Sequence, residues 1–546
     1  MQIRSDILRI YQKVHLWTGI STGILLFICF FAGALTMFKP QLSAWAAPPA
    51  NVLPQIPAAQ LDNLLQQALI QHPEIAKGFT LHLDDDKYAP LSWHSQGGKR
   101  GLNLDAKQWQ ATLDAQGQLR TQEVQPSQLG KLIDQLHRTA GIPGHIGHEQ
   151  LGVLVMGVAA VLYFMALVSG VIFLLPTLVK TLFALRRKKG PSRFWLDAHN
   201  LLGITALPFH IIIALTVVVF AFHDVFYDAL GELVYDERPA FMRGAPLVQP
   251  LDISQMPPLR DIIAAADSHA PGYRTRTMTF MGLDGPRPGV RAEMYSDTAL
   301  MRGPVADFLA LQPYSLQVQF STFTPGEEGI WARMVAVFFG LHFGSYGGIG
   351  GRWLYFFMGL GGAMLFYSGN LLWLEKRRKQ QKTDEALPQQ PRKVRWMAAA
   401  TVGCCLGAMV AVACTLLAGK WLYPWVSNIN YSYLWCYYLC FSAAVLYSFW
   451  RGAARAAIDL LSLGAVTCSA LPLTSLLATL LPSLGLWAPH TLATLTVDIM
   501  ALVFAAGFFY CARLTRRRAL NGPPDSIWAL PNNPERAPQP SRLSAY

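Results

Sequence analysis

Eight long apolar segments constrain the fold of this chain more than any other feature. They lie near residues 16–38, 150–175, 196–222, 352–374, 396–419, 431–450, 456–481 and 491–512. Each is as long as, or longer than, the roughly 20 residues that a helix needs to cross a hydrocarbon core about 30 Å thick. Only 14% of the 546 residues are charged, whereas about 25% is usual in soluble domains. The sequence therefore predicts an α-helical polytopic membrane protein with about eight transmembrane helices in a lipid bilayer.

Clusters of Lys and Arg in the short connections predict the orientation of the chain. They follow the second, fourth, sixth and eighth apolar segments, at residues 186–189, 376–379, 451–455 and 516–518. Because Lys and Arg mark cytoplasmic loops, this pattern places both termini in the cytoplasm. The net charge of +12 is then mainly a topology signal, and no nucleic-acid partner is predicted.

A duplicated pattern occupies the first 380 residues. In each half, an apolar segment opening with His-x-x-x-Gly is followed by a long outer loop, a Leu-His pair and a segment ending in Ser-Gly. Tandem repeats place equivalent residues at equivalent depths. We therefore expect His15 and His199 near the inner membrane face, and His137 and His342 near the outer face. The two Ser-Gly pairs are Ser169-Gly170 and Ser368-Gly369.

Two layers of two histidines suit a particular cofactor. Neutral imidazole is an axial ligand of haem iron, and the interior of a helix bundle supplies dry, apolar surroundings. The sequence thus predicts two bis-histidine b-type haems, one layer above the other. Gly19 and Gly203, one turn beyond the inner pair, would let a flat macrocycle approach the backbone. Arg138 and Arg352 stand where haem propionates would emerge at the outer face.

Three other histidines are rival iron ligands. His145 and His148 also precede the second apolar segment, and His210 lies deeper in the third. On one continuous ideal helix, His199 and His210 would be roughly 20° from the same face and about 16 Å apart along the axis. The remaining histidines are predicted to be ordinary polar or surface residues; they are His72, His82, His94, His223, His269 and His490.

The chain divides into a membrane core, a linker, a second membrane block and a tail. The predicted bounds are 1–380 for the four-helix core with outer lobes at 39–149 and 223–330, 381–395 for the linker, 396–515 for the additional four-helix block and 516–546 for the cytoplasmic tail. Each lobe is predicted to be α+β. The expected helices lie near 61–70 and 127–139, and the expected strands near 79–82, 91–94, 109–113, 277–281 and 290–295.

A basic cluster in the second lobe has two interpretations. It contains Arg274, Arg276, Met278 and Met281. One interpretation is an ordinary solvated surface of a sheet, and the other is a docking face for an anionic or metal-chelating ligand.

These motifs in combination resemble the PepSY-associated transmembrane-helix family. The resemblance covers roughly residues 7–380 and leaves out the last four apolar segments. It rests on His15-Leu-Trp-Thr-Gly, Leu136-His137-Arg138, Asp197-Ala-His199-Asn-Leu-Leu-Gly, Leu341-His342-Phe-Gly and a Gly-rich, aromatic fourth segment ending near Trp373 and Glu375. The resemblance implies a bacterial inner-membrane location, PepSY-like periplasmic lobes, and the activity of a ferric-siderophore reductase with haem in a four-helix core.

We therefore expect a di-haem protein that passes electrons to ferric iron in a periplasmic siderophore or other chelate and so supports iron uptake. Reduction weakens the hold of a hard-oxygen chelator, because Fe(II) is the softer, less charged ion. A quinol or a separate reductase would donate the electrons. The alternative is a non-redox binding, transport or protease-inhibitory module in which the histidines serve packing or metal passage.

Overall fold

Two compact units make up the chain. The computed structural model describes residues 4–48, 53–83, 89–94, 101–147, 149–178, 185–186, 191–233, 251–297, 299, 301, 303, 306–322, 330–382 and 386–530. Unit 1 comprises Met1–Phe31, Ser169–Thr205 and Gly362–Tyr546, and unit 2 comprises Ala32–Val168 and Ala206–Gly361.

Within the described residues, seven helices are long and apolar enough to cross a membrane. They are Ser5–Thr36 (α1), Leu151–Thr177 (α5, Leu151–Leu174, with a following turn), Leu207–Phe226 (in α8), Gly348–Lys376 (α11), Arg392–Trp425 (α12 and α13), Ala453–Leu480 (α15) and Leu492–Asn521 (α16). The other expected span, 431–450, is helix α14 (Ile429–Arg451). Its tyrosines keep its hydropathy below that of the other seven; they are Tyr431, Tyr433, Tyr437, Tyr438 and Tyr447. The chain is thus a multi-pass membrane protein with one expected span less apolar than predicted.

The prediction of one continuous helix through 196–222 is wrong. Helix α7 (Pro191–Thr205) ends before Ala206, and helix α8 (Leu207–Leu233) begins directly after it. Pro208 explains the break, because proline has no N–H and its ring collides with the carbonyl of the preceding turn. His199 and His210 therefore belong to different helices, and their alignment on one ideal helix does not apply.

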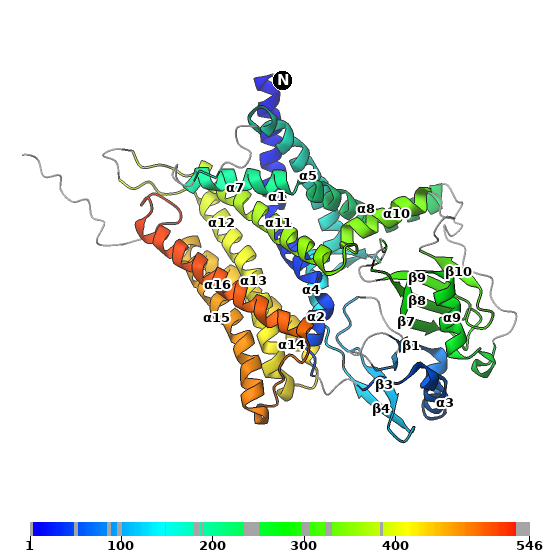
Figure 1. Ribbon diagram of the computed structural model, residues 1–546. Helices are drawn as coiled ribbons and strands as arrows, with labels where there is room; N and C mark the ends of the chain where they lie inside the picture. The colour runs from blue at the N-terminus through cyan, green and yellow to red at the C-terminus, as the bar shows by residue number, and fades with distance from the viewer. Residues whose placement is uncertain are drawn as a thin grey trace, which may run out of the picture. The chain divides into compact units, whose positions relative to one another are not determined.

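Unit 2 contains one antiparallel eight-stranded sheet built from both lobes (Figure 1). Its order is β10-β9-β8-β7-β1-β2-β3-β4. The strands are β1 Gly78–His82, β2 Leu91–His94, β3 Gln108–Leu113, β4 Leu119–Val124, β7 Arg274–Met281, β8 Gly289–Tyr295, β9 Asp307–Leu311 and β10 Val318–Ser321. The lobes join where β1 pairs with β7, from Gly78↔Met281 to His82↔Thr277. The five expected strands are confirmed, but the two expected lobes form a single sheet.

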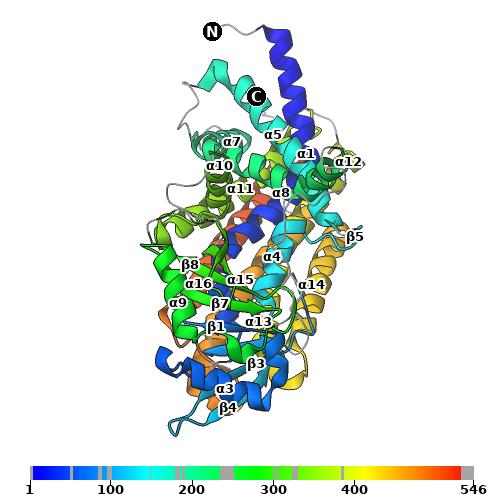
Figure 2. The same cartoon turned by 90° about the vertical axis from the view of Figure 1, so that its right-hand side faces the viewer.

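Two helices cover one face of this sheet, as Figure 2 shows. They are α3 (Leu61–Gln71) and α9 (Leu259–His269), one from each lobe. Leu64 of α3 and Ile262 of α9 are fully buried on the sides of these helices that pack against the sheet. At the seam, the rings of Phe79 and Phe280 stack with centroids 4.3 Å apart, and both are almost completely buried. The lobes therefore share one hydrophobic core.

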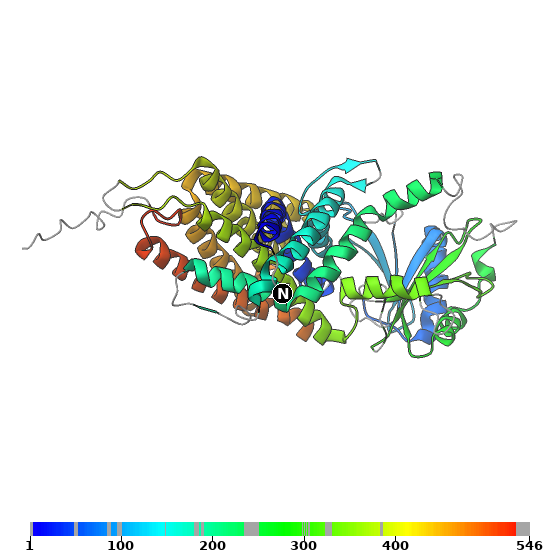
Figure 3. The same cartoon turned by 90° about the horizontal axis from the view of Figure 1, so that it is seen from above.

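The additional membrane block lies in unit 1. Helix α13 (Gly407–Leu422) packs against α14 and α15 (Ala453–Leu480), and α15 packs against α16 (Leu492–Asn521), the yellow-to-red helices of Figure 3. Lys420 is buried in this bundle, where its Nζ donates to Ser475 Oγ at 3.2 Å and to the Trp487 carbonyl at 2.9 Å. A buried cation needs such acceptors, so these contacts fix the packing of α13 on α15.

Removing a ring at the seam tests whether the lobes fold together. Phe280→Ala in the second lobe is expected to cost about 3–5 kcal/mol, as for other buried Phe truncations. Limited proteolysis should then cut both lobes faster than in the unaltered protein. Phe320→Ala, at a ring that is 54% exposed on β10, is the matched control and should change little. Faster cleavage of the second lobe alone would contradict a shared core.

Candidate functional site

Unit 1 brings His15 of α1 and His199 of α7 together. Their ring centroids lie 6.2 Å apart, and their planes are inclined by 77°. His199 Nδ1 is 3.1 Å from both the Leu365 carbonyl oxygen and Ser368 Oγ on α11. Ser368 Oγ itself donates to the Leu365 carbonyl at 2.9 Å, so its remaining capacity is to accept. His199 Nδ1–H is therefore the donor, and the lone pair lies on Nε2.

The Ser-Gly pairs explain why the rings fit. A Cβ at Gly170 would stand 2.9 Å from His15 Cε1, and a Cβ at Gly369 would stand 3.3 Å from His199 Cε1. Each glycine thus leaves room for one imidazole ring on the facing helix. The neighbouring serines, Ser169 and Ser368, are both buried. The repeated sequence pattern therefore corresponds to a repeated contact.

Unit 2 brings His137 and His342 together at a similar ring separation. His137 lies on α4 (Leu129–Thr139) and His342 on α10 (Ile330–Phe343), with ring centroids 6.4 Å apart and planes inclined by 36°. His342 Nδ1 is 2.8 Å from Thr216 Oγ1. That hydroxyl donates to the Ile212 carbonyl at 2.7 Å, so it accepts from His342 Nδ1–H. The lone pair of His342 again lies on Nε2.

A third glycine contact was missed by the sequence analysis. A Cβ at Gly33 of α1 would stand 2.7 Å from His137 Nδ1. Gly33 follows His15 by 18 residues, about five turns of helix, so the two residues occupy the same face of α1. This spacing is the signal that would have identified Gly33.

The rival histidines are placed differently. His210 on α8 is fully buried, with its ring against Tyr163 (centroids 6.1 Å apart) and Phe209 (5.5 Å). His145 is exposed on the short strand β5 (His145–Ile146). His148 lies outside the described residues. The residues predicted to pair are thus those that lie together, while their binding of a metal stays a prediction.

An ion pair missed by the sequence analysis anchors α7. The Asp197 side chain has no exposed surface and accepts from Arg186 Nη2 at 2.7 Å and Nε at 2.9 Å. The same carboxylate accepts from the Arg186 backbone N–H at 3.0 Å, and Arg193 Nε lies 3.5 Å away. These hydrogen bonds hold the pKa of Asp197 below its ordinary value. Because Asp197 precedes His199 by two residues, it positions the helix that carries His199.

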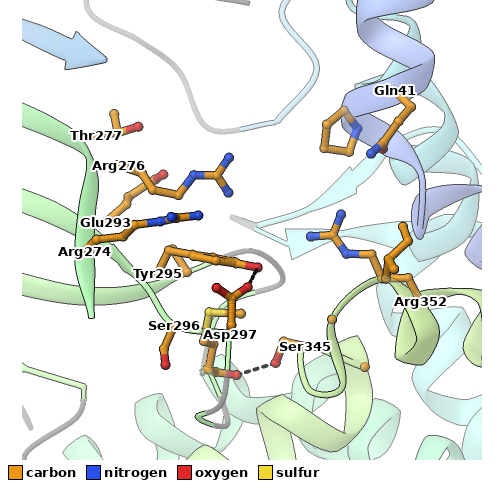
Figure 4. A pocket seen from close by; sticks show the side chains of 16 residues that line it. Gln41, Arg274, Arg276, Thr277, Glu293, Tyr295, Ser296, Asp297, Ser345 and Arg352 are labelled. Atoms are coloured by element: carbon orange, nitrogen blue, oxygen red, sulfur yellow. Dashed lines mark hydrogen bonds between the residues drawn. The ribbon is translucent and has the colours of Figure 1, made fainter. Parts of the chain in front are cut away.

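The two predicted arginines occupy separate surroundings. Arg138 is exposed at the end of α4. Arg352, in the first turns of α11, lines a cavity in unit 2 together with Arg274 and Arg276 (Figure 4). Among the described residues, no group of three or more His, Cys, Asp or Glu side chains has a metal-binding arrangement.

Comparison with known proteins shows that the histidine pairs lie within one family region of the chain. The model of a family described as the PepSY-associated TM region matches residues 12–376, which include all four paired histidines. A protein of Pseudomonas aeruginosa described as uncharacterized is 25% identical over 260 residues. That alignment covers 44% of this chain and 61% of the relative, so the chain spans about three fifths of the relative's length.

The glycine contacts predict that adding one methyl group destabilises the protein at a glycine packed against a histidine ring but not at a glycine with free space. Gly170→Ala would press on the His15 ring and is expected to destabilise the protein by about 1–3 kcal/mol, as overpacking does elsewhere. Gly507→Ala adds the same group on α16, where no atom lies within 4 Å, and it serves as the control. Thermal unfolding of the purified variants measures both. Equal melting temperatures for the two would contradict close packing at Gly170.

Proposed function

Since the chain belongs to the family of PepSY-associated transmembrane proteins, we propose that it is a di-haem electron-transfer protein of the bacterial inner membrane. It reduces ferric iron in a periplasmic siderophore or other chelate. The spacing of the two histidine pairs is the observation that supports this proposal most directly. The lobes lie on the periplasmic side, as the basic connections indicate.

The ring spacing fits a shared metal ion. Two imidazole nitrogens, each about 2 Å from one first-row metal, lie about 4 Å apart, and the half-ring behind each nitrogen brings the centroids to about 6 Å. The observed separations are 6.2 Å and 6.4 Å. A structural zinc site needs four protein ligands, whereas a bis-histidine haem needs only two.

Hydrogen bonds prepare His199 and His342 as ligands. A histidine that binds a metal usually donates its other N–H to a fixed acceptor, which sets its tautomer and the orientation of its ring. Leu365 and Ser368 do this for His199, and Thr216 does it for His342. In both rings the lone pair therefore lies on Nε2, the nitrogen that would bind a metal.

Space beside the inner pair also suits a macrocycle. A Cβ at Gly19 would have no atom within 4 Å, and one at Gly203 would meet only Leu365 Cδ1, at 3.6 Å. Haem, when bound, would supply one-electron redox chemistry, and the two histidine pairs would hold it in apolar surroundings. A quinol or a separate reductase donates two electrons, which convert two Fe(III) ions to Fe(II). Fe(II) then leaves a hard-oxygen chelator more easily.

The purified protein is expected to contain about two b-type haems per chain, because each histidine pair supplies both axial ligands. A pyridine haemochrome assay against protein concentration measures the ratio. His199→Ala and His342→Ala should each reduce it to about one.

His210→Ala is the matched control, because His210 is buried beside aromatic rings and is not one of the paired ligands. It should keep both haems. A ratio near zero in the unaltered protein would remove the redox function and favour the non-redox alternative. Loss of haem from His210→Ala with retention in His137→Ala would reassign the outer ligand.

The direction of electron flow is also testable. Reduced protein in oriented vesicles should be reoxidised by a membrane-impermeant ferric chelate added on the lobe side, because the outer pair lies on that side in the proposed topology. The corresponding gallium chelate, which accepts no electron, is the control. Absorbance of the reduced haem reports the reaction. Reoxidation only from the side of the basic connections would reverse the path.

A further inference from the structure

A polar cavity lies within unit 2, between the sheet and the start of α11. Its volume is about 350 Å³. Figure 4 shows the side chains of Arg274 and Arg276 entering from β7, and that of Arg352 entering from α11. Gly344 and Ser345, which follow His342 closely in the chain, line the same cavity. The outer histidine pair and this cavity are therefore joined by a few residues of one connection.

The strand geometry presents two of these arginines side by side. The register of β7 against β8 shifts between Thr275 and Thr277, so Arg276 is the extra residue of a bulge. Bulges re-aim side chains and are frequent beside functional sites. The guanidinium carbons of Arg274 and Arg276 each lie 5.1 Å from the centre of the Tyr295 ring. The ring thus supports both cations on the same side of the cavity.

Positive charge dominates the cavity. The carboxylate of Asp297 accepts a hydrogen bond from Tyr295 Oη at 2.7 Å, and the carboxylate of Glu293 lies 3.7 Å from Nη2 of Arg291, which is outside the cavity lining. Three guanidinium groups therefore face two carboxylates, each of which already has a partner. The N-terminus of α11 contributes Gly348 and Ile349 to the lining, and the first turn of a long helix carries partial positive charge.

We propose that this cavity binds the carboxylate groups of a small polycarboxylate anion. Arginine forks match carboxylates in geometry as well as in charge. Cations on two sides of the space favour a ligand with at least two carboxylates over a monocarboxylate. The identity of this ligand as the substrate rests on the proposed function, in which it is the organic part of a ferric chelate. The same chemistry occurs in the propionates of a haem held by His137 and His342.

Isothermal titration of citrate into the purified protein, as isolated, tests the cavity without any redox step. Citrate should bind, and acetate should bind far more weakly. Arg276→Gln should weaken citrate binding about tenfold or more, since a hydrogen bond to a charged group contributes about 1.5–3 kcal/mol. Arg260→Gln makes the same charge change at a side chain that is 75% exposed on α9 and lies outside the cavity lining, so it should bind citrate normally.

Haem content of the same variants distinguishes the two carboxylate sources. Lost citrate binding with unchanged haem content identifies a free chelate. Loss of one haem in Arg276→Gln, with citrate binding only to the His342→Ala protein, which would lack the outer haem, identifies the propionates. Arg276→Lys keeps the positive charge but removes the forked guanidinium group, so it tests whether that geometry is needed. Thermal unfolding of each variant without ligand shows whether its fold is retained.

Unaltered citrate binding in Arg274→Gln, Arg276→Gln and Arg352→Gln would overturn the proposal. The proposal would also be overturned if citrate bound neither to the protein as isolated nor to His342→Ala while haem content stayed unchanged in all three arginine variants. Citrate binding by a protein that never contains haem would instead support the cavity and remove the proposed redox function.

Discussion

The burial of imidazole rings between helices is the constraint on which the membrane part of this structure depends. A buried polar ring is costly unless its nitrogens find partners. His199 Nδ1 has a hydrogen-bond partner on α11, the Leu365 carbonyl at 3.1 Å, and His342 Nδ1 has one on α8, Thr216 Oγ1 at 2.8 Å. Glycines on facing helices provide the space that the rings occupy. The helices therefore pack together where these hydrogen bonds and small residues coincide.

The pairing of the histidines could be predicted because a duplicated sequence carries its own spatial information. The break before α8 was missed, since hydropathy alone does not register Pro208. The union of both lobes was missed for another reason. Phe79 and Phe280 stack across a seam between strands about two hundred residues apart, and local periodicity contains no record of such pairing. The ion pair of Asp197 was missed because its partner Arg186 belongs to a basic connection that also serves as a topology signal.

The additional membrane block is structurally continuous with the matched family region. Asn370 of α11 donates to Thr401 Oγ1 at 3.3 Å, and Leu371 and Leu374 share a buried core with Val394. These residues lie in the same unit as the inner histidine pair. The match to the family ends at residue 376, yet α11 contributes to both the pair and the block. The additional block and the inner histidine pair therefore share α11 as a structural element.

The arginines that line the cavity matter for the energy of the proposed chemistry as well as for binding. On the proposed function, an electron at the outer site would add negative charge in surroundings of low dielectric, where nearby cations would interact strongly with it. Arg274, Arg276 and Arg352 would favour the reduced state there and raise its potential. An anionic ligand in the cavity would offset part of that effect. On the proposed function, the same three side chains thus hold the acceptor and set the driving force for its reduction, which couples occupancy of the cavity to the potential of the site.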